Sequence, residues 1–424
     1  MLKKVVGWTF GLFVVSIPLV QPLEFPVLGL GAQLADLIFA FTALLAVIAV
    51  LRRDLSLNWS PSYVYIFLYA GTFVLASFFA DEPMRSLGRL AILLYLIAIT
   101  VLTSSLSAGE SRRRNIVLGL VIGTALTSLG TIVGIALFYA GLTSPDENFL
   151  LSPTGTLPAG NYPRIHSLFV NANMMCNYLN VGIVAIFLAR KSGWISRNLF
   201  VVLAAGAWLA AIATLSPGIG GIVLSSGLWF WYLNRSTNRR FCAGVLYASI
   251  AAAVFFLAVT LITLDSPNTD QDFRVPVVGA NVEPSVRVLV WQQALAKIYR
   301  SPILGSGPGA NAADVFYVTP SGTHHLLRDG HDVWVNVAVQ TGLVGVISLL
   351  MMTGFILFNY RAGPDQTDER NMYMAALKCA LVGSFFYQGL TGSFEDARHL
   401  WLLFGLIIGS ASPGDAEVKS QASP

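Results

Sequence analysis

Long apolar segments, each about as long as a bilayer is thick, recur along this sequence and limit what it can fold into. A helix needs about 20 mostly apolar residues to cross the hydrocarbon core. Lipid offers no hydrogen-bond partner to the backbone, so such segments fold as helices, and they lack the alternation that marks a strand. Charged residues make up 11% of the chain, against about 25% in soluble domains. We therefore predict an all-α integral membrane protein with about twelve transmembrane helices. The segments are 4–20, 33–51, 63–80, 87–106, 115–141, 168–189, 198–214, 217–233, 241–264, 332–358, 371–392 and 398–412.

Basic residues are concentrated in every second connection between these segments. Lys and Arg are enriched in cytoplasmic connections of membrane proteins. The opposite short connections contain one basic residue, Arg85. They are 21–32, 81–86, 215–216 and 393–397. This asymmetry predicts that both termini lie in the cytoplasm. The basic residues on that side are Lys3, Lys4, Arg52, Arg53, Arg112, Arg113, Arg114, Arg190, Lys191, Arg197, Arg235, Arg239, Arg240, Arg361 and Arg370.

Two connections on the outer side are much longer than tight turns. They cover residues 142–167 and 265–331, and loops of this length are usually functional or disordered. The stretch "EPSVRVLVWQQALAKIYRSP" in the second predicts a helix with one apolar face, with Pro284 in its first turn and Pro302 near its end. We expect this helix to lie at the membrane surface. We predict one polytopic membrane domain over 1–424, with 265–331 as a large outer loop between spans nine and ten.

A histidine and an aspartate, His331 and Asp332, stand where this outer loop meets the tenth apolar segment. A carboxylate can orient an imidazole or raise its pKa, but neighbours in a helix do not face each other. A helix cap or a surface histidine is therefore the alternative to a catalytic role. His325 and Arg328 lie just upstream. The spacing H-H-x5-H is not a zinc pattern, so we predict no metal site.

Arginines on the outer side are candidates for binding a phosphate group, because guanidinium binds phosphate oxygens bidentately. Arg287 lies in the first turn of the predicted helix, where free N–H groups also favour an anion. Arg164 follows a proline in "NYPRIH", and Arg89 lies near the outer end of span four. We predict that these three bind a pyrophosphate, whereas Arg274 and Arg300 are interpreted as surface anchors.

A last outer turn, "GSFEDARHLW" at 392–401, holds four ionisable side chains. They are either an ion cluster that satisfies itself or part of the same outer cavity as His331. These side chains are Glu395, Asp396, Arg398 and His399.

The chain resembles the O-antigen ligases of bacterial lipopolysaccharide assembly, which belong to a wider family with the O-antigen polymerases. The family motif is His, then Asn, Ser or Gln, nine residues, Gly, two residues, and Gly, Thr or Tyr. Here it reads His331, Asp332, nine residues, Gly342, two residues and Gly345, and it departs from the motif only at Asp332. The stretches "RIHSLFVNANMMCNYL" at 164–179, "VRVLVWQQALAKIYRSPILGSGPG" at 286–309 and "FEDARHLW" at 394–401 also look like their family counterparts.

The resemblance implies a multi-pass enzyme of the bacterial inner membrane whose active site faces the periplasm. It would be a metal-independent, inverting glycosyltransferase that moves O-antigen polysaccharide from undecaprenyl pyrophosphate to a sugar hydroxyl of lipid A-core. His331 would be the base, and the three arginines would bind the pyrophosphate. No cofactor and no nucleic-acid partner are expected. The supporting residues would be Asp332, His325, Arg328 and Asp396.

Two other functions stay open. An O-antigen polymerase shares the lipid donor and the architecture, but such polymerases tend to carry Arg, ten residues and Gly in their outer loops. None of the loop arginines here has glycine at that spacing. A transporter would place ionisable groups near the bilayer midplane, whereas here they are concentrated in the outer connections.

Overall fold

A computed structural model of the protein describes residues 2–21, 24–27, 30–142, 150–154, 162–265, 281–318, 324–359 and 368–411. Within these ranges the main chain forms thirteen α-helices. A π-helical segment, Val382–Tyr387, continues α12. The helices are α1 (Leu2–Ser16), α2 (Leu34–Leu51), α3 (Ser62–Ser77), α4 (Pro83–Ser107), α5 (Glu110–Tyr139), α6 (Ala172–Lys191), α7 (Arg197–Ala213), α8 (Ile219–Asn234), α9 (Arg239–Val259), α10 (Val286–Arg300), α11 (Val333–Phe358), α12 (Asp368–Leu381) and α13 (Arg398–Ala411).

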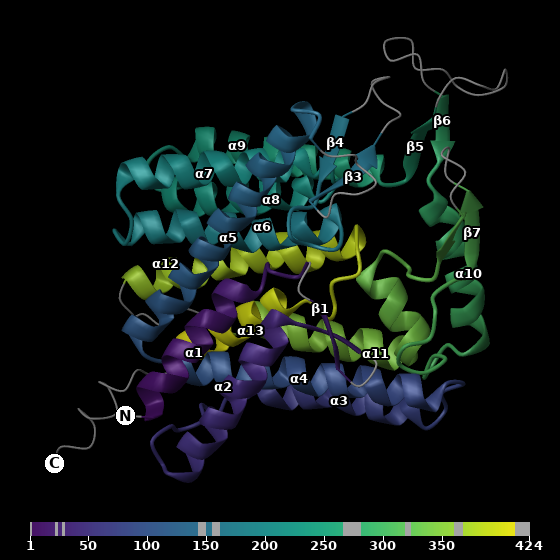
Figure 1. The fold of residues 1–424 in the computed structure, drawn as a ribbon, viewed down its shortest axis with the longest axis horizontal. Coiled ribbons are helices and arrows are strands. Elements are labelled where there is room, and N and C mark those ends of the chain that lie inside the picture. Colours follow the sequence, from purple (N-terminus) through teal and green to yellow (C-terminus); the bar gives the residue numbers. More distant parts are fainter. Residues whose placement is uncertain are drawn as a thin grey trace.

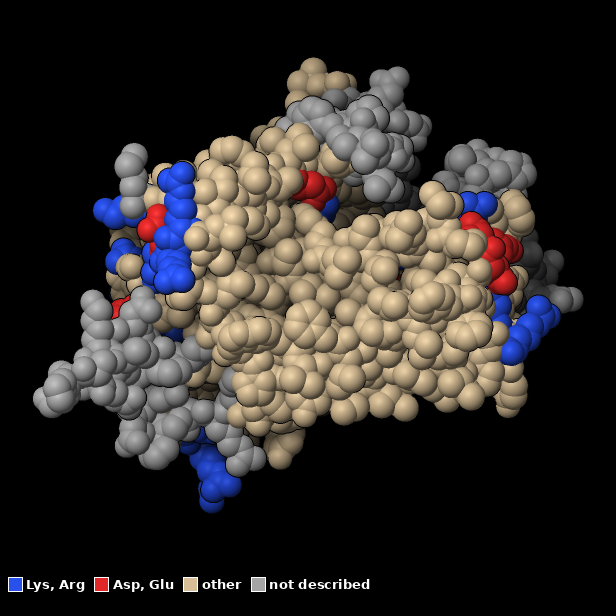
Figure 2. Space-filling view, turned by 90° about the horizontal axis from the view of Figure 1, so that it is seen from below, with Lys and Arg blue, Asp and Glu red and all other residues tan. Residues whose placement is uncertain are grey.

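The all-α membrane character predicted from the sequence is confirmed. Six of the described helices, α2, α4, α5, α6, α9 and α11, are long and apolar enough to cross a membrane, and α3, α7 and α13 are shorter apolar helices. Each of the twelve predicted segments overlaps a helix, although twelve crossings remain a prediction. Most helices run along the long axis of Figure 1. Figure 2 shows charged residues gathered at both ends of a face, with Lys and Arg predominating at one end, and mostly uncharged surface between.

Short antiparallel hairpins occur in the connections between the helices. Each pairs two strands of four residues, and the last two hairpins lie beside α10 at the right of Figure 1. The strands are β1 (Glu24–Val27), β2 (Leu30–Gln33), β3 (Leu151–Thr154), β4 (Tyr162–Ile165), β5 (Ile262–Asp265), β6 (Asn281–Pro284), β7 (Val315–Val318) and β8 (His324–Leu327).

The helix predicted in the long outer loop is α10, but it begins at Val286, after the proline that was expected in its first turn. Pro284 is the last residue of β6 and not part of the first helical turn. Ser285 is the N-cap instead, because its hydroxyl accepts the Arg287 N–H at 3.4 Å, a preferred role of serine. Val290 and Ala294 are the buried residues of this helix.

Helix α11 is interrupted at Gly342, the glycine of the family motif. Its φ of 65° and ψ of −166° are not helical, and only glycine adopts this conformation readily. The interruption frees backbone groups, which must find partners where water is scarce. Residues after the last turn of α10 supply them: Leu343 N–H donates to Pro302 O at 2.9 Å, and Val344 N–H to Ile303 O at 3.3 Å.

The same glycine-rich segment, 302–309, continues along the first half of α11. Ser306 N–H donates to Val339 O at 2.8 Å and Gly307 N–H to Gln340 O at 3.0 Å. Gly309 N–H donates to the Gln340 side-chain oxygen at 3.0 Å. The segment "LGSGPG" at 304–309 therefore ties the end of α10 to the helix that follows His331.

Replacing Gly342 with alanine should destabilise the protein strongly. The added Cβ would overlap the Ile303 carbonyl, and a non-glycine residue at this φ and ψ costs about 1–3 kcal/mol by itself. Gly354→Ala is the matched control, since it lies later in α11 and a Cβ there meets no atom within 4 Å. Melting of both variants in detergent tests this. Equal melting temperatures would show that the break in α11 is not a required feature of the fold.

Candidate active site

Asp332 and His331 take different roles at the start of α11. Asp332 is the N-cap, and its Oδ1 accepts the N–H groups of Trp334 at 2.8 Å and Val335 at 3.0 Å. His331 has a φ of 47°, a left-handed conformation that is uncommon for non-glycine residues. The imidazole faces Asp329 and not Asp332: Nδ1 of His331 lies 3.9 Å from Oδ1 of Asp329. Asp332 is therefore a helix cap, and its role in a reaction stays a prediction.

Asp329 holds the backbone of His331 and links it to Ser393 and Asn336. Its Oδ1 accepts the His331 N–H at 2.6 Å and the hydroxyl of Ser393. Asn336 Nδ2 donates to the same oxygen at 3.4 Å, and its Oδ1 accepts the Gly330 N–H at 2.8 Å. The loop before α11 is thus joined to α11 itself and to the connection before α13, so His331 is held in one place.

The imidazole of His331 is poised to accept a proton. Burial lowers its pKa below the usual 6.5, and the nearby Arg287 lowers it further, while Asp329 acts in the opposite direction. The ring is therefore neutral at neutral pH, which is the form that works as a base. About a third of the side chain, 35%, is still exposed at the surface.

Arg287 and Arg164, predicted to bind a pyrophosphate, lie close enough to repel each other. Arg287 donates from Nη1 to Thr391 O at 2.9 Å. Arg164 donates from Nε to Thr214 O and from Nη2 to Asn173 Oδ1, both at 3.0 Å. These acceptors are all neutral. Among the described residues, neither arginine forms an ion pair with a carboxylate.

The pKa values of both arginines are lowered by the same cause, burial of the guanidinium group. Burial lowers the pKa of Arg287, and the charge of Arg164 lowers it further; Asp332 and Asp329 oppose this shift. Burial also lowers the pKa of Arg164. A phosphate bound between two guanidinium groups would remove their repulsion and form strong charge-assisted hydrogen bonds.

Other predicted site residues have partners elsewhere. Arg89 forms an ion pair with Asp396 at 2.8 Å, and Arg328 lies 3.9 Å from Asp314. Both arginines are therefore less available to a ligand than Arg164 and Arg287. His325 is in β8, but its side chain lies outside the described residues; Arg274 is outside them altogether.

The four ionisable residues of the 392–401 turn do not satisfy one another. Arg398 binds Asp36 of α2 through two hydrogen bonds of 2.7 and 2.6 Å, and His399 Nε2 lies 2.5 Å from Asn177 Oδ1 of α6. These two side chains join helices. Glu395 instead accepts from Asn336 Nδ2 at 3.4 Å, and Asp396 forms an ion pair with Arg89. Asn336 also contacts Asp329, so Glu395 is linked to the residues around His331.

Sequence reasoning missed Asp329, Asn336 and Ser393 as parts of this site. Asn336 carried the one usable signal, because a buried amide in an otherwise apolar segment usually has a specific partner. Asp329 and Ser393 lie 64 positions apart, and nothing in the local pattern connects them.

Glu395 is a neutral acid inside this cluster. Burial, together with the negative charges of Asp396 and Asp329, raises its pKa to about 8. Its Oε2 is buried and has no hydrogen-bond partner among the described residues. At neutral pH the side chain therefore carries a proton and adds no negative charge to the site.

This raised pKa predicts a stability that falls as the pH rises. Between the ordinary pKa of 4.5 and about 8, the folded protein keeps a proton that the unfolded chain has lost, so unfolding becomes easier with increasing pH. Glu395→Gln should flatten the fall in melting temperature between pH 5 and pH 8. Glu110→Gln, at an exposed position, is the control. An unchanged slope in Glu395→Gln would contradict a protonated Glu395.

Comparison with known families places this geometry in context. Residues 181–350 match the family model described as O-antigen ligase, which confirms the resemblance noted in the sequence. The match begins in α6 and ends in α11, so it includes Arg287, His331, Gly342 and Gly345. This domain is shared by O-antigen ligases and polymerases and indicates a membrane enzyme that transfers lipid-linked glycans. No curated protein matches the chain.

Proposed function

We propose that this chain, whose residues 181–350 form an O-antigen ligase domain, is an inverting glycosyltransferase of the bacterial inner membrane. It transfers O-antigen polysaccharide from undecaprenyl pyrophosphate to a sugar hydroxyl of lipid A-core, without a metal, at the periplasmic face. The observation that carries the proposal is a neutral, partly exposed His331 near Arg287, which itself lies close to Arg164. Both arginines are partly buried and lack carboxylate partners among the described residues.

In the proposed reaction, His331 removes the proton of the acceptor hydroxyl as its oxygen attacks the anomeric carbon of the donor. General bases usually contribute about 10²–10⁴-fold in rate. Asp329 is a positioning residue, because it bonds the His331 backbone and faces the imidazole. One displacement from the face opposite the leaving group inverts the anomeric configuration.

The bond from the anomeric carbon to the pyrophosphate oxygen breaks, and the lipid pyrophosphate leaves with the electron pair. Arg164 and Arg287 stabilise the charge that develops on it. Fixed donors aimed at developing charge in a site of low dielectric usually provide a large part of catalysis. The energy for the transfer comes from the donor, so the reaction needs no nucleotide.

A polymerase remains the second candidate, since its domain is the same. The loop arginines lack the Arg, ten residues and Gly spacing typical of polymerases, which favours the ligase. Deletion of the gene in its host separates the two. Loss of a ligase leaves long lipid-linked polymer beside lipopolysaccharide without O-antigen, whereas loss of a polymerase leaves single repeat units. A transporter is disfavoured because the matched family is one of glycan-transferring enzymes.

Purified protein should join the two lipid substrates in excess EDTA, and the new linkage should be inverted relative to the donor. His331→Ala should lower the rate by about 10²–10⁴-fold with donor binding retained. Mass spectrometry of the product and NMR of its anomeric proton measure these outcomes. A reaction that requires added magnesium or manganese, or a retained configuration, would overturn the proposed mechanism.

Arg287→Lys should impair transfer although it keeps the positive charge. Lysine cannot form the two parallel hydrogen bonds that a guanidinium makes to phosphate, so the KM for the donor should rise by about tenfold. Arg240→Lys, at the exposed start of α9, is the matched control. Equal kinetics in both variants would assign Arg287 a structural role only.

A further inference from the structure

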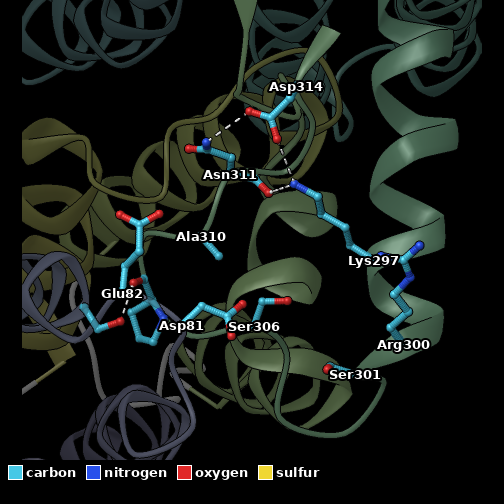
Figure 3. Close-up of a pocket in the computed structure, with 11 residues that line it drawn as sticks. Asp81, Glu82, Lys297, Arg300, Ser301, Ser306, Ala310, Asn311 and Asp314 are labelled. Carbon is cyan, nitrogen blue, oxygen red and sulfur yellow. Dashed lines mark hydrogen bonds and ion pairs between the residues drawn. The ribbon is translucent and has the colours of Figure 1, made fainter.

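A polar cavity lies near the candidate active site and is unused by the reaction described above. Its volume is about 330 Å³, and it lies between the turn that joins α3 to α4 and the last turn of α10 (Figure 3). Cavities that bind small ligands usually measure about 300–1,000 Å³. Its lining includes Asp81, Glu82, Ser86, Arg300, Ser301 and Ser306.

One wall of the cavity is acidic, and the other carries two basic residues together with the acid Asp314. Asp81 and Glu82 lie on one side and Lys297 and Arg300 on the other (Figure 3). Lys297 is bound to Asn311 O at 2.9 Å and to Asp314 at 3.3 Å. Within the described part of the chain, Asp81 and Arg300 form no ion pair or hydrogen bond through their side chains. Both walls thus present unused hydrogen-bonding groups.

The cavity has fixed walls. The Ser86 hydroxyl donates to Pro308 O at 2.7 Å, which joins α4 to the glycine-rich segment. That segment is itself bound to α11 through Ser306 N–H and Val339 O. A ligand would therefore enter a preformed space, and little conformational entropy would be lost on binding.

The cavity and the candidate active site are neighbours that share structural elements. Ser86 lines the cavity, and Arg89, one turn further along α4, holds Asp396 beside Glu395. On the other side, Asp314 lines the cavity and contacts Arg328, three residues before His331. A glycan whose reacting sugar lies at His331 could extend along these shared elements toward the cavity.

The mixture of charges argues against an ionic ligand. A phosphate would be repelled by Asp81 and Glu82, and a cation by Lys297 and Arg300. A sugar hydroxyl both donates and accepts hydrogen bonds, so it satisfies both walls at once. Ser301 and Ser306 add two further hydroxyls to the lining.

We propose that this cavity is a glycan subsite, which takes a neutral sugar unit next to the linkage being made. The subsite rests on the proposed function, because that function brings two glycans to this face. The sugar belongs either to the donor polysaccharide or to the acceptor core, and the two share the hydroxyl chemistry that the cavity recognises.

Kinetics with Arg300→Ala and Asp81→Ala test the subsite. Loss of a hydrogen bond from a charged group should raise the KM for one of the two substrates by about tenfold, with kcat changed less than twofold. Tyr299→Ala is the matched control, since Tyr299 is 87% exposed on the same turn of α10 and does not line the cavity. A raised KM for the donor identifies the polysaccharide, and a raised KM for the acceptor identifies the core.

Binding of oligosaccharide to a variant that cannot catalyse transfer tests the subsite independently of the reaction. Oligosaccharide released from each lipid is added to His331→Ala protein, and saturation-transfer NMR measures its contact. One oligosaccharide should give a signal that Arg300→Ala in the same background removes and Tyr299→Ala keeps. Unchanged KM values and signals in the cavity variants would overturn the subsite while the transferase stands. Absence of any transfer by the wild-type protein would overturn the function, and the binding arm would still test the cavity.

Discussion

Backbone hydrogen bonds between the 302–309 segment and α11 hold together the end of the protein that carries His331. A helix interrupted inside a membrane protein exposes polar groups that lipid cannot bind, and here the Pro302 and Ile303 carbonyls bind them. The interruption is possible because Gly342 has no side chain where the Ile303 carbonyl passes. The consequence reaches both sites. The first half of α11 presents His331 at its start, and the same segment forms a wall of the polar cavity.

The sequence predicted the elements better than their junctions. Apolar length located the helices because a bilayer imposes that length on any crossing, and the periodicity of 283–302 located α10. Pro284 was misplaced because Ser285, one residue on, makes a better cap. The spacing of Gly342 in the motif was visible, yet its purpose was not, since it depends on the Ile303 carbonyl. Likewise, Asp329 gained its role only when folding brought Ser393 beside it; such long-range pairs leave no periodic trace.

Arginines in this protein fall into two groups that differ in their partners. Arg398 forms two hydrogen bonds with Asp36 and joins α13 to α2, because a buried charge is tolerated when it is paired. Arg89 likewise holds Asp396. Arg164 and Arg287 are bound only to neutral oxygens, which leaves their charge uncompensated among the described residues. Such an arrangement costs folding free energy. In the proposed reaction, an anionic ligand would offset this cost. The unpaired charges therefore lie where the proposed reaction needs positive charge.

The acids near His331 would weaken that positive field if all of them were ionised. Glu395 avoids this because burial and the neighbouring Asp396 and Asp329 keep it protonated at neutral pH. Asp396 is compensated by Arg89. Asp329 accepts hydrogen bonds from the His331 N–H and the Ser393 hydroxyl. In the proposed reaction, Asp329 orients the base, whereas a neutral Glu395 adds no charge that would repel a pyrophosphate. A single turn, 392–401, supplies Glu395 and Asp396 and also Arg398, which joins α13 to α2. The electrostatics of the site and the packing of these helices therefore depend on the same turn.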